Sequence, residues 1–110
     1  MADYKRSMPI RQDEPLESED KSTLISTSSI TIKFSQDIIG LEIANNSSTA
    51  TIYLNISGSI ATLLKGLPIY AKQYYSADKK IKRNVGISLI SNESLTDVRI
   101  IGHFNLEAEE

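Results

Sequence analysis

Alternation of apolar and polar residues is the feature that most restricts how this chain folds. The stretch ATIYLNIS, residues 50–57, places an apolar residue at every second position, with Thr51, Tyr53 and Asn55 between them. Successive side chains of an extended strand point to opposite faces, so this pattern is typical of a half-buried β-strand. Less regular versions of the pattern occur at 29–35, 38–44, 85–91 and 97–105.

Polar turn residues separate these runs. NNSST at 45–49 and SNESLTD at 91–97 contain the Asn, Ser and Asp side chains that form local turns. Strands about ten residues apart with such turns between them predict an all-β fold, a small antiparallel β-sandwich or barrel. We expect Ile38, Ile90 and Ile101 to point outward. The residues expected to face the core are Ile30, Ile32, Phe34, Ile39, Leu41, Ile43, Ala50, Ile52, Leu54, Ile56, Val85, Ile87, Leu89, Val98, Ile100 and Phe104.

The stretch 66–83, GLPIYAKQYYSADKKIKR, allows two structures. Pro68 could begin a helix, but the apolar residues would then form only a broken stripe. As a strand, residues 67–76 alternate properly, and Tyr70, Lys72 and Tyr74 share one face. Tyrosine favours protein interfaces because its ring buries area and its hydroxyl finds a partner. We therefore predict a strand here, with Tyr70, Lys72 and Tyr74 as a candidate partner interface.

A polar segment precedes the alternating runs. Residues 1–28 contain two of the three prolines, four basic residues and six acidic ones, and their apolar residues follow no period. Such a segment cannot bury enough surface to order itself, so it is either a disordered tail or an arm ordered by a partner. We take it as an extended arm, followed by a β domain at 29–110. The candidate anchoring residues are Tyr4, Arg6, Met8, Ile10, Arg11 and Leu16.

One cluster of charge stands out in the β domain. Lys79, Lys80, Lys82 and Arg83 lie within five residues and are candidates for electrostatic contact. They form either a solvated loop, a contact with an acidic partner, or part of a single-stranded nucleic-acid site with the nearby tyrosines. The formal net charge of the whole chain is −2, so charge gives no general case for nucleic acid or anionic membrane.

Motifs of catalysis and metal binding are missing from the sequence. The chain has no cysteine, and its single histidine, His103, has no second histidine for a zinc site, so we read it as a surface or edge residue. Neither a phosphate-binding loop nor a G-x-S-x-G elbow occurs. We therefore expect a protein that is not an enzyme and uses no cofactor or metal. The first residues lack the apolar core of a signal peptide, and we expect synthesis in a cytoplasm.

The order of these parts resembles small β-rich structural proteins of tailed-phage virions. The resemblance rests on EIANNSSTATIYLNI, KGLPIYAKQYYS, VGISLIS and TDVRIIGHF, and covers about two thirds of the chain. It implies a non-enzymatic building part of a head, neck, tail or fibre, located in the virion and assembled in the host cytoplasm. The implied partners are a major capsid or neck and tail protein, and further copies of the chain; no membrane and no nucleic acid are expected.

Two other functions stay open at this point. Tyr70, Tyr74 and Tyr53 could form sugar platforms in a carbohydrate-binding module for host attachment. Alternatively, the tyrosines and the Lys79–Arg83 cluster could bind single-stranded nucleic acid.

Overall fold

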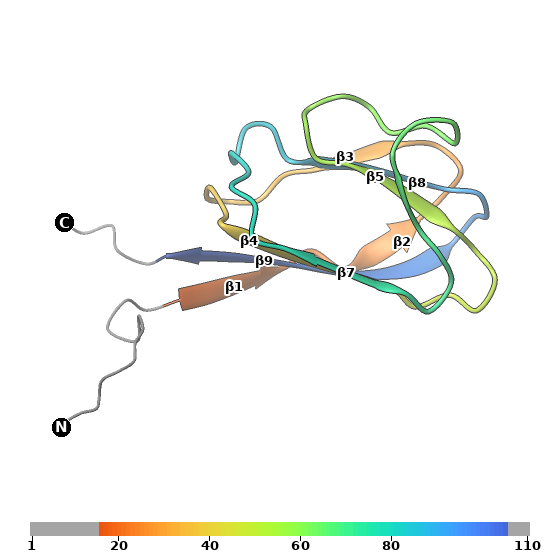
Figure 1. The fold of residues 1–110 in the computed structure, drawn as a ribbon, viewed down its shortest axis with the longest axis horizontal. Helices are drawn as coiled ribbons and strands as arrows, with labels where there is room; N and C mark the ends of the chain where they lie inside the picture. The colour runs from red at the N-terminus through yellow and green to blue at the C-terminus, as the bar shows by residue number, and fades with distance from the viewer. Residues whose placement is uncertain (1–15, 106–110) are drawn as a thin grey trace, which may run out of the picture.

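A computed structural model of the chain describes residues 16–105, and these form an all-β sandwich. The expected fold class is confirmed. Two antiparallel sheets lie one above the other with the apolar core between them (Figure 1). Nine strands are present in this part of the chain: β1 (Leu16–Asp20), β2 (Thr23–Ile25), β3 (Ile30–Ile32), β4 (Gly40–Asn45), β5 (Ile52–Asn55), β6 (Leu67–Ile69), β7 (Tyr74–Ala77), β8 (Ile87–Ser91) and β9 (Thr96–Asn105).

The first sheet is built around the long strand β9. It has the order β1-β9-β4-β7. β2 also pairs with β9, on the same edge as β1 but with the first residues of β9. The second sheet has the order β3-β8-β5-β6. We call them the β9 sheet and the β8 sheet after their central strands.

The core contains most of the residues that the alternation predicts. In β5, Ile52 and Leu54 are buried and Tyr53 between these two is half-buried. In β9, Val98 and Ile100 are also buried. β-branched side chains on the inner faces of both sheets fill the space between the layers.

The prediction was wrong for the residues that precede β4 and β8, and for Ile90 within β8. Ile38 and Ile90, expected outward, are buried, whereas Ile39 and Val85, expected inward, are 36% and 39% exposed. Ile38 exchanges two backbone hydrogen bonds with Ile81, each 2.9 Å, and this bridge turns its side chain into the core ahead of β4. β8 is a central strand, and all five of its residues are buried.

The sheet extends into the segment expected to be an arm. Strand β1 pairs with the second half of β9, from Asp20↔Ile101 to Leu16↔Asn105, and β2 pairs with its first half. Ile25 is fully buried in the core. The described β domain therefore starts at Leu16 rather than at Ser29, and Tyr4, Arg6, Met8, Ile10 and Arg11 lie outside the described residues.

The expected strand at 67–76 is broken by a turn. β6 ends at Ile69 in the β8 sheet, and β7 begins at Tyr74 in the β9 sheet, so the chain crosses between the layers. The N–H of Gln73 donates to the Tyr70 carbonyl at 2.9 Å, and Lys72 has a φ of 64°. Lys72 therefore belongs to a turn, and the three residues do not share one strand face.

Asn45 anchors this crossing inside the protein. Its amide donates to the carbonyls of Ala50 at 2.8 Å and Ile69 at 2.9 Å, while its own side-chain oxygen accepts from the Ser47 N–H. The side chain is 1% exposed, so its polar atoms depend on these partners. Asn45 thus joins the end of β4 to the end of β6 in the opposite sheet.

Candidate functional site

Strands β1 and β9 form a two-stranded extension at one end of the sandwich. They run side by side past the body of the molecule (Figure 1), with Leu16 opposite Asn105. A carboxylate ties β1 to the body: Glu19 accepts hydrogen bonds from the N–H and the hydroxyl of Ser35, both at 2.9 Å. Lys21 lies 3.3 Å from the same carboxylate. The position at which the preceding residues leave the sandwich is therefore fixed.

The ionisation of Glu19 reflects this tie. Burial alone would raise the pKa of its carboxyl, but the hydrogen bonds from Ser35 and the ion pair with Lys21 outweigh burial and lower the pKa. The carboxylate is thus the form that the surrounding groups stabilise.

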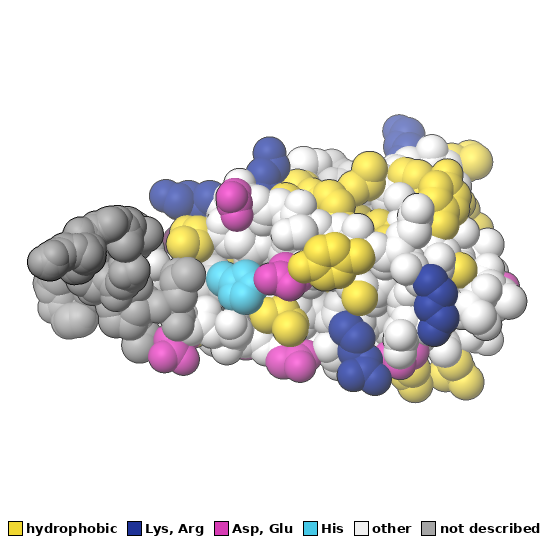
Figure 2. All heavy atoms as spheres, turned by 60° about the horizontal axis from the view of Figure 1, so that its bottom comes forward, with side chains coloured by type: hydrophobic (Ala, Val, Ile, Leu, Met, Phe, Trp, Pro, Cys, Tyr) yellow, Lys and Arg dark blue, Asp and Glu magenta, His cyan; other side chains and the backbone are white. Residues whose placement is uncertain are grey.

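A chain of hydrogen bonds crosses the outer face of the β9 sheet. The Tyr74 hydroxyl donates to one oxygen of Glu42 at 2.6 Å, and Nε2 of His103 lies 2.7 Å from the other oxygen. Nδ1 of His103 lies 3.0 Å from the Ser18 hydroxyl. Each residue comes from a different strand, in the order β7, β4, β9 and β1, so the chain spans the width of the sheet. Figure 2 shows this face, with the histidine beside an acidic and a hydrophobic side chain.

The hydrogen bond between Tyr74 and Glu42 shifts the pKa values of the two groups in opposite directions. The hydrogen bond from Tyr74, followed by that from His103, lowers the pKa of the Glu42 carboxyl. The same bond raises the pKa of the Tyr74 hydroxyl, because ionised Tyr74 would face a carboxylate.

Ser18, His103 and Glu42 are also the residue types of a hydrolytic triad. In such a triad the histidine takes a proton from the serine and the acid orients the histidine, within a cleft that binds substrate. Here they lie on a sheet face, and none of them lines the described pocket. His103, expected at a surface or edge, is half-buried on this face, and its partners, which lie 61 and 85 positions away in the chain, were not predicted from the sequence.

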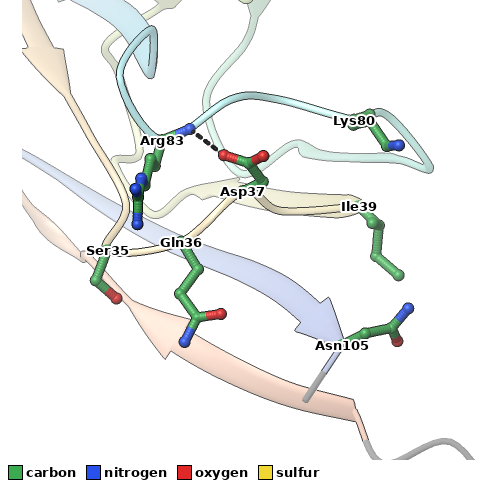
Figure 3. A pocket seen from close by; sticks show the side chains of 7 residues that line it. All are labelled: Ser35, Gln36, Asp37, Ile39, Lys80, Arg83 and Asn105. Carbon is green, nitrogen blue, oxygen red and sulfur yellow. Dashed lines mark hydrogen bonds between the residues drawn. The ribbon is translucent and has the colours of Figure 1, made fainter. Parts of the chain in front are cut away.

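A pocket opens beside the β1–β9 extension. It has a volume of about 560 Å³ and is shallow and open to solvent. Its walls come from the β3–β4 loop (residues 33–39), the β7–β8 loop (residues 78–86) and the end of β9. We call it the end pocket (Figure 3); the lining residues are Ser35, Gln36, Asp37, Ile39, Lys80, Arg83 and Asn105.

The predicted basic cluster forms one wall of the end pocket. Lys79, Lys80, Lys82 and Arg83 are all exposed, and Lys80 and Arg83 line the pocket. The Arg83 N–H donates to Asp37 at 2.8 Å, which holds the β7–β8 loop against the β3–β4 loop. Tyr70 lies in the turn before β7 and Tyr74 begins that strand, whereas the cluster follows it, and neither tyrosine lines the end pocket.

The β5–β6 loop (residues 56–66) carries exposed apolar side chains. Leu64 is 95% exposed, next to Leu63 at the tip of a turn closed by two hydrogen bonds between Thr62 and Lys65, 3.0 and 3.2 Å long. The loop is pinned below this tip, because the Ala61 N–H donates to the buried Ser88 hydroxyl at 2.8 Å. An exposed apolar tip on a fixed loop is typical of a contact with another molecule.

Metal sites and membrane-spanning helices are both missing from residues 16–105. No group of three or more His, Cys, Asp or Glu side chains there is arranged to hold a metal ion. That part of the chain also contains no helix of the length and apolarity needed to cross a membrane.

Comparison with known proteins supports the fold class. No protein-family model and no curated protein matches the chain. Among solved structures, the chain is similar to the coat protein of Tobacco streak virus, with a TM-score of 0.52 and 10% identity over 94% of each chain. It also matches a protein of Bacillus endospore appendages, described as disulfide-linked pili, with a TM-score of 0.45 and 12% identity over 92% of this chain and 97% of that one. At this identity the coat-protein likeness shows a shared fold.

Proposed function

We propose that this protein is a non-enzymatic structural subunit of a virion, associated with the capsid as a decoration, head-fibre or neck protein. In this proposal the N-terminal residues attach the subunit and the β-sandwich makes or displays further contacts. The observation that carries it is the β1–β9 extension, which delivers the preceding residues at a fixed place beside Asn105.

The sequence of residues 1–15 suits an attachment segment. It contains three basic and three acidic residues, with Tyr4, Met8 and Ile10 among them. Aromatic, Met and Arg side chains are enriched in interface cores, and mixed charges at the rim give register. Because Glu19 holds β1 to the β3–β4 loop, such a segment would transmit its attachment directly to the folded domain.

Two further observations support a role in assembly. The exposed Leu63 and Leu64 offer an apolar contact on a pinned loop. The sandwich also shares its fold with a virus coat protein, which supports the proposal of a β-rich structural subunit. We propose the Ser18–His103–Glu42–Tyr74 chain as a cross-strand tie rather than a hydrolytic site.

The two alternative functions receive less support. Tyr70 and Tyr74 are 54% and 62% exposed, but they follow or begin strands of different sheets, and the Tyr74 hydroxyl is bound to Glu42. A sugar platform or a base-stacking face built on one strand therefore lacks its expected geometry.

The test is attachment to capsids assembled without this protein. Full-length protein should co-sediment with them, whereas protein lacking residues 1–15 should remain in the supernatant while keeping its far-UV spectrum and cooperative melting. A matched control carries the same fifteen residues in scrambled order. Equal co-sedimentation of all three proteins would show that the N-terminal residues are not the anchor.

A further inference from the structure

The end pocket is a cationic site with no partner within the described fold. Lys80 and Arg83 line it together with a single acidic residue, Asp37, whose carboxylate already accepts the Arg83 N–H. Figure 3 shows the Arg83 and Lys80 side chains extending from the β7–β8 loop on either side of Asp37. Across that loop, four cations stand against one anion, Asp78. The site therefore suits a ligand with several carboxylates.

The chain itself contains such a ligand, and it begins at the rim of the pocket. Residues 106–110, LEAEE, carry three glutamates and no cation, and we call them the acidic segment. They directly follow Asn105, which lines the end pocket and ends β9. Five residues span at most about 17 Å when extended, which is enough to cross a pocket of this size.

The direction of β9 determines whose pocket the acidic segment meets. β9 runs outward past the body of its own sandwich (Figure 1), so entry into its own pocket would require a sharp reversal. The acidic segment has no Gly, Pro, Asn, Asp or Ser, the residues that favour tight turns. A pocket on a facing molecule needs no reversal.

We propose that the end pocket binds the acidic segment of a second copy of this chain, so that two subunits meet end to end and exchange their segments. The pocket and Asn105, the residue from which the acidic segment continues, lie at the same end of the subunit. Two subunits related by a two-fold axis can therefore each bind the segment of the other. This inference rests on the proposed function and deepens it by naming the self-contact that an assembling subunit would use.

The experiment is a charge exchange in the full-length protein. One variant reverses the pocket (Lys80→Glu/Arg83→Glu), and the other reverses the acidic segment (Glu107→Lys/Glu109→Lys/Glu110→Lys). In each variant by itself the pocket and the segment carry the same sign of charge and repel each other. We therefore expect the dimer Kd of each variant, measured by sedimentation equilibrium, to rise at least about tenfold. In an equimolar mixture of the two variants both contacts are again complementary, so the mixture should form a heterodimer. The Kd of this heterodimer should depend on salt concentration as the Kd of the wild-type dimer does.

The control moves the same charge change away from the end pocket. Lys65→Glu/Arg99→Glu alters an exposed loop and the outer face of the β9 sheet, and should leave the dimer Kd within about twofold of wild type. Thermal melts of all variants verify folding. A mixture that stays monomeric would overturn the inference, as would a wild-type chain that is monomeric at every concentration.

The result also separates this inference from the proposed function. Capsid co-sedimentation of the wild type and of the pocket variant is measured in parallel. If both attach but neither dimerises, the self-contact is wrong and the proposed function stands. If the wild type dimerises but does not attach, the proposed function is wrong and the self-contact stands.

Discussion

Leu16 at the start of β1 lies directly opposite Asn105 at the end of β9, so the two ends of the described chain leave the sandwich side by side. The end pocket and its basic wall lie at this same end. The backbone positions to which residues 1–15 and 106–110 connect, and the cationic pocket, therefore lie at one end of a small domain. This grouping makes the end of the sandwich, rather than the tyrosines near the sheet crossing, the proposed region of assembly contacts.

The Tyr74–Glu42 bond predicts how this face responds to pH. The folded-state pKa of Glu42 is lowered, so its stabilisation is present above the unfolded pKa and is lost as pH falls through the folded value. The pKa of Tyr74 is raised above 10.0, so its stabilisation is present below that value and is lost as pH rises through the folded pKa. In a ¹³C-tyrosine NMR titration, Glu42→Gln should lower the Tyr74 midpoint, because the hydrogen bond to a carboxylate is lost. An unchanged Tyr74 midpoint in Glu42→Gln would contradict this account.

Asn45 should be one of the most sensitive polar positions in the fold. Asn45→Ala removes the donors to the Ala50 and Ile69 carbonyls in a buried site, and we expect it to lower the free energy of unfolding by about 3 kcal/mol. Asn46→Ala is the matched control, because Asn46 is exposed and its side-chain amide donates to the Asp97 carboxylate at 2.9 Å; its effect should stay within about 0.5 kcal/mol. Urea unfolding measures both. Similar losses for the two variants would show that the link between the sheets contributes little.

Glycine is required at position 102 of β9 but not at position 40 of the neighbouring strand β4. A Cβ at Gly102 would lie 2.7 Å from Cε1 of Phe34 and 3.0 Å from Cγ2 of Ile38, whereas a Cβ at Gly40 would have no atom closer than 3.6 Å. Gly102→Ala should therefore destabilise the domain by about 1–3 kcal/mol through overpacking, and Gly40→Ala by less than about 0.5 kcal/mol. Thermal unfolding of the two variants decides the matter, and equal melting temperatures would argue against a tightly packed Phe34.

The tie between Glu19 and Ser35 should control how firmly β1 is held. Glu19→Ala removes the acceptor of two hydrogen bonds and should cost about 1–2 kcal/mol, with faster amide exchange in β1. Glu19→Gln keeps an acceptor oxygen and should retain most of the protection. Hydrogen exchange resolved along residues 16–20 tests this directly; unchanged exchange in Glu19→Ala would mean that pairing with β9 alone holds β1.

The sequence predicts the strands and their buried faces where apolar and polar residues alternate regularly. It does not predict them where contacts between distant residues determine the structure. The runs around Ile52 and Ile100 predicted strands with the correct face inward, because period-2 burial is a local property. The turn at Lys72 was missed because the tyrosine-rich stretch continues the alternation across it, and the turn depends on buried Asn45, 27 positions earlier. The pairing of β1 with β9 joins residues more than eighty positions apart, and the polar composition of residues 16–20 resembles a solvated segment.

The candidate site was likewise predictable from the sequence only in its local features. The basic cluster at Lys79–Arg83 was recognised from composition, but its place on a pocket with Asp37 depends on how two loops meet. The polar chain through Glu42 and His103 has no sequence motif, because its members come from four strands.

The most direct test of the central claim is co-sedimentation of the full-length protein with capsids that lack it, beside protein without residues 1–15. The account predicts that the full-length protein sediments with the capsids and that the shortened protein, though folded, stays behind. Full-length protein that remains in the supernatant, or shortened protein that sediments equally well, would contradict it.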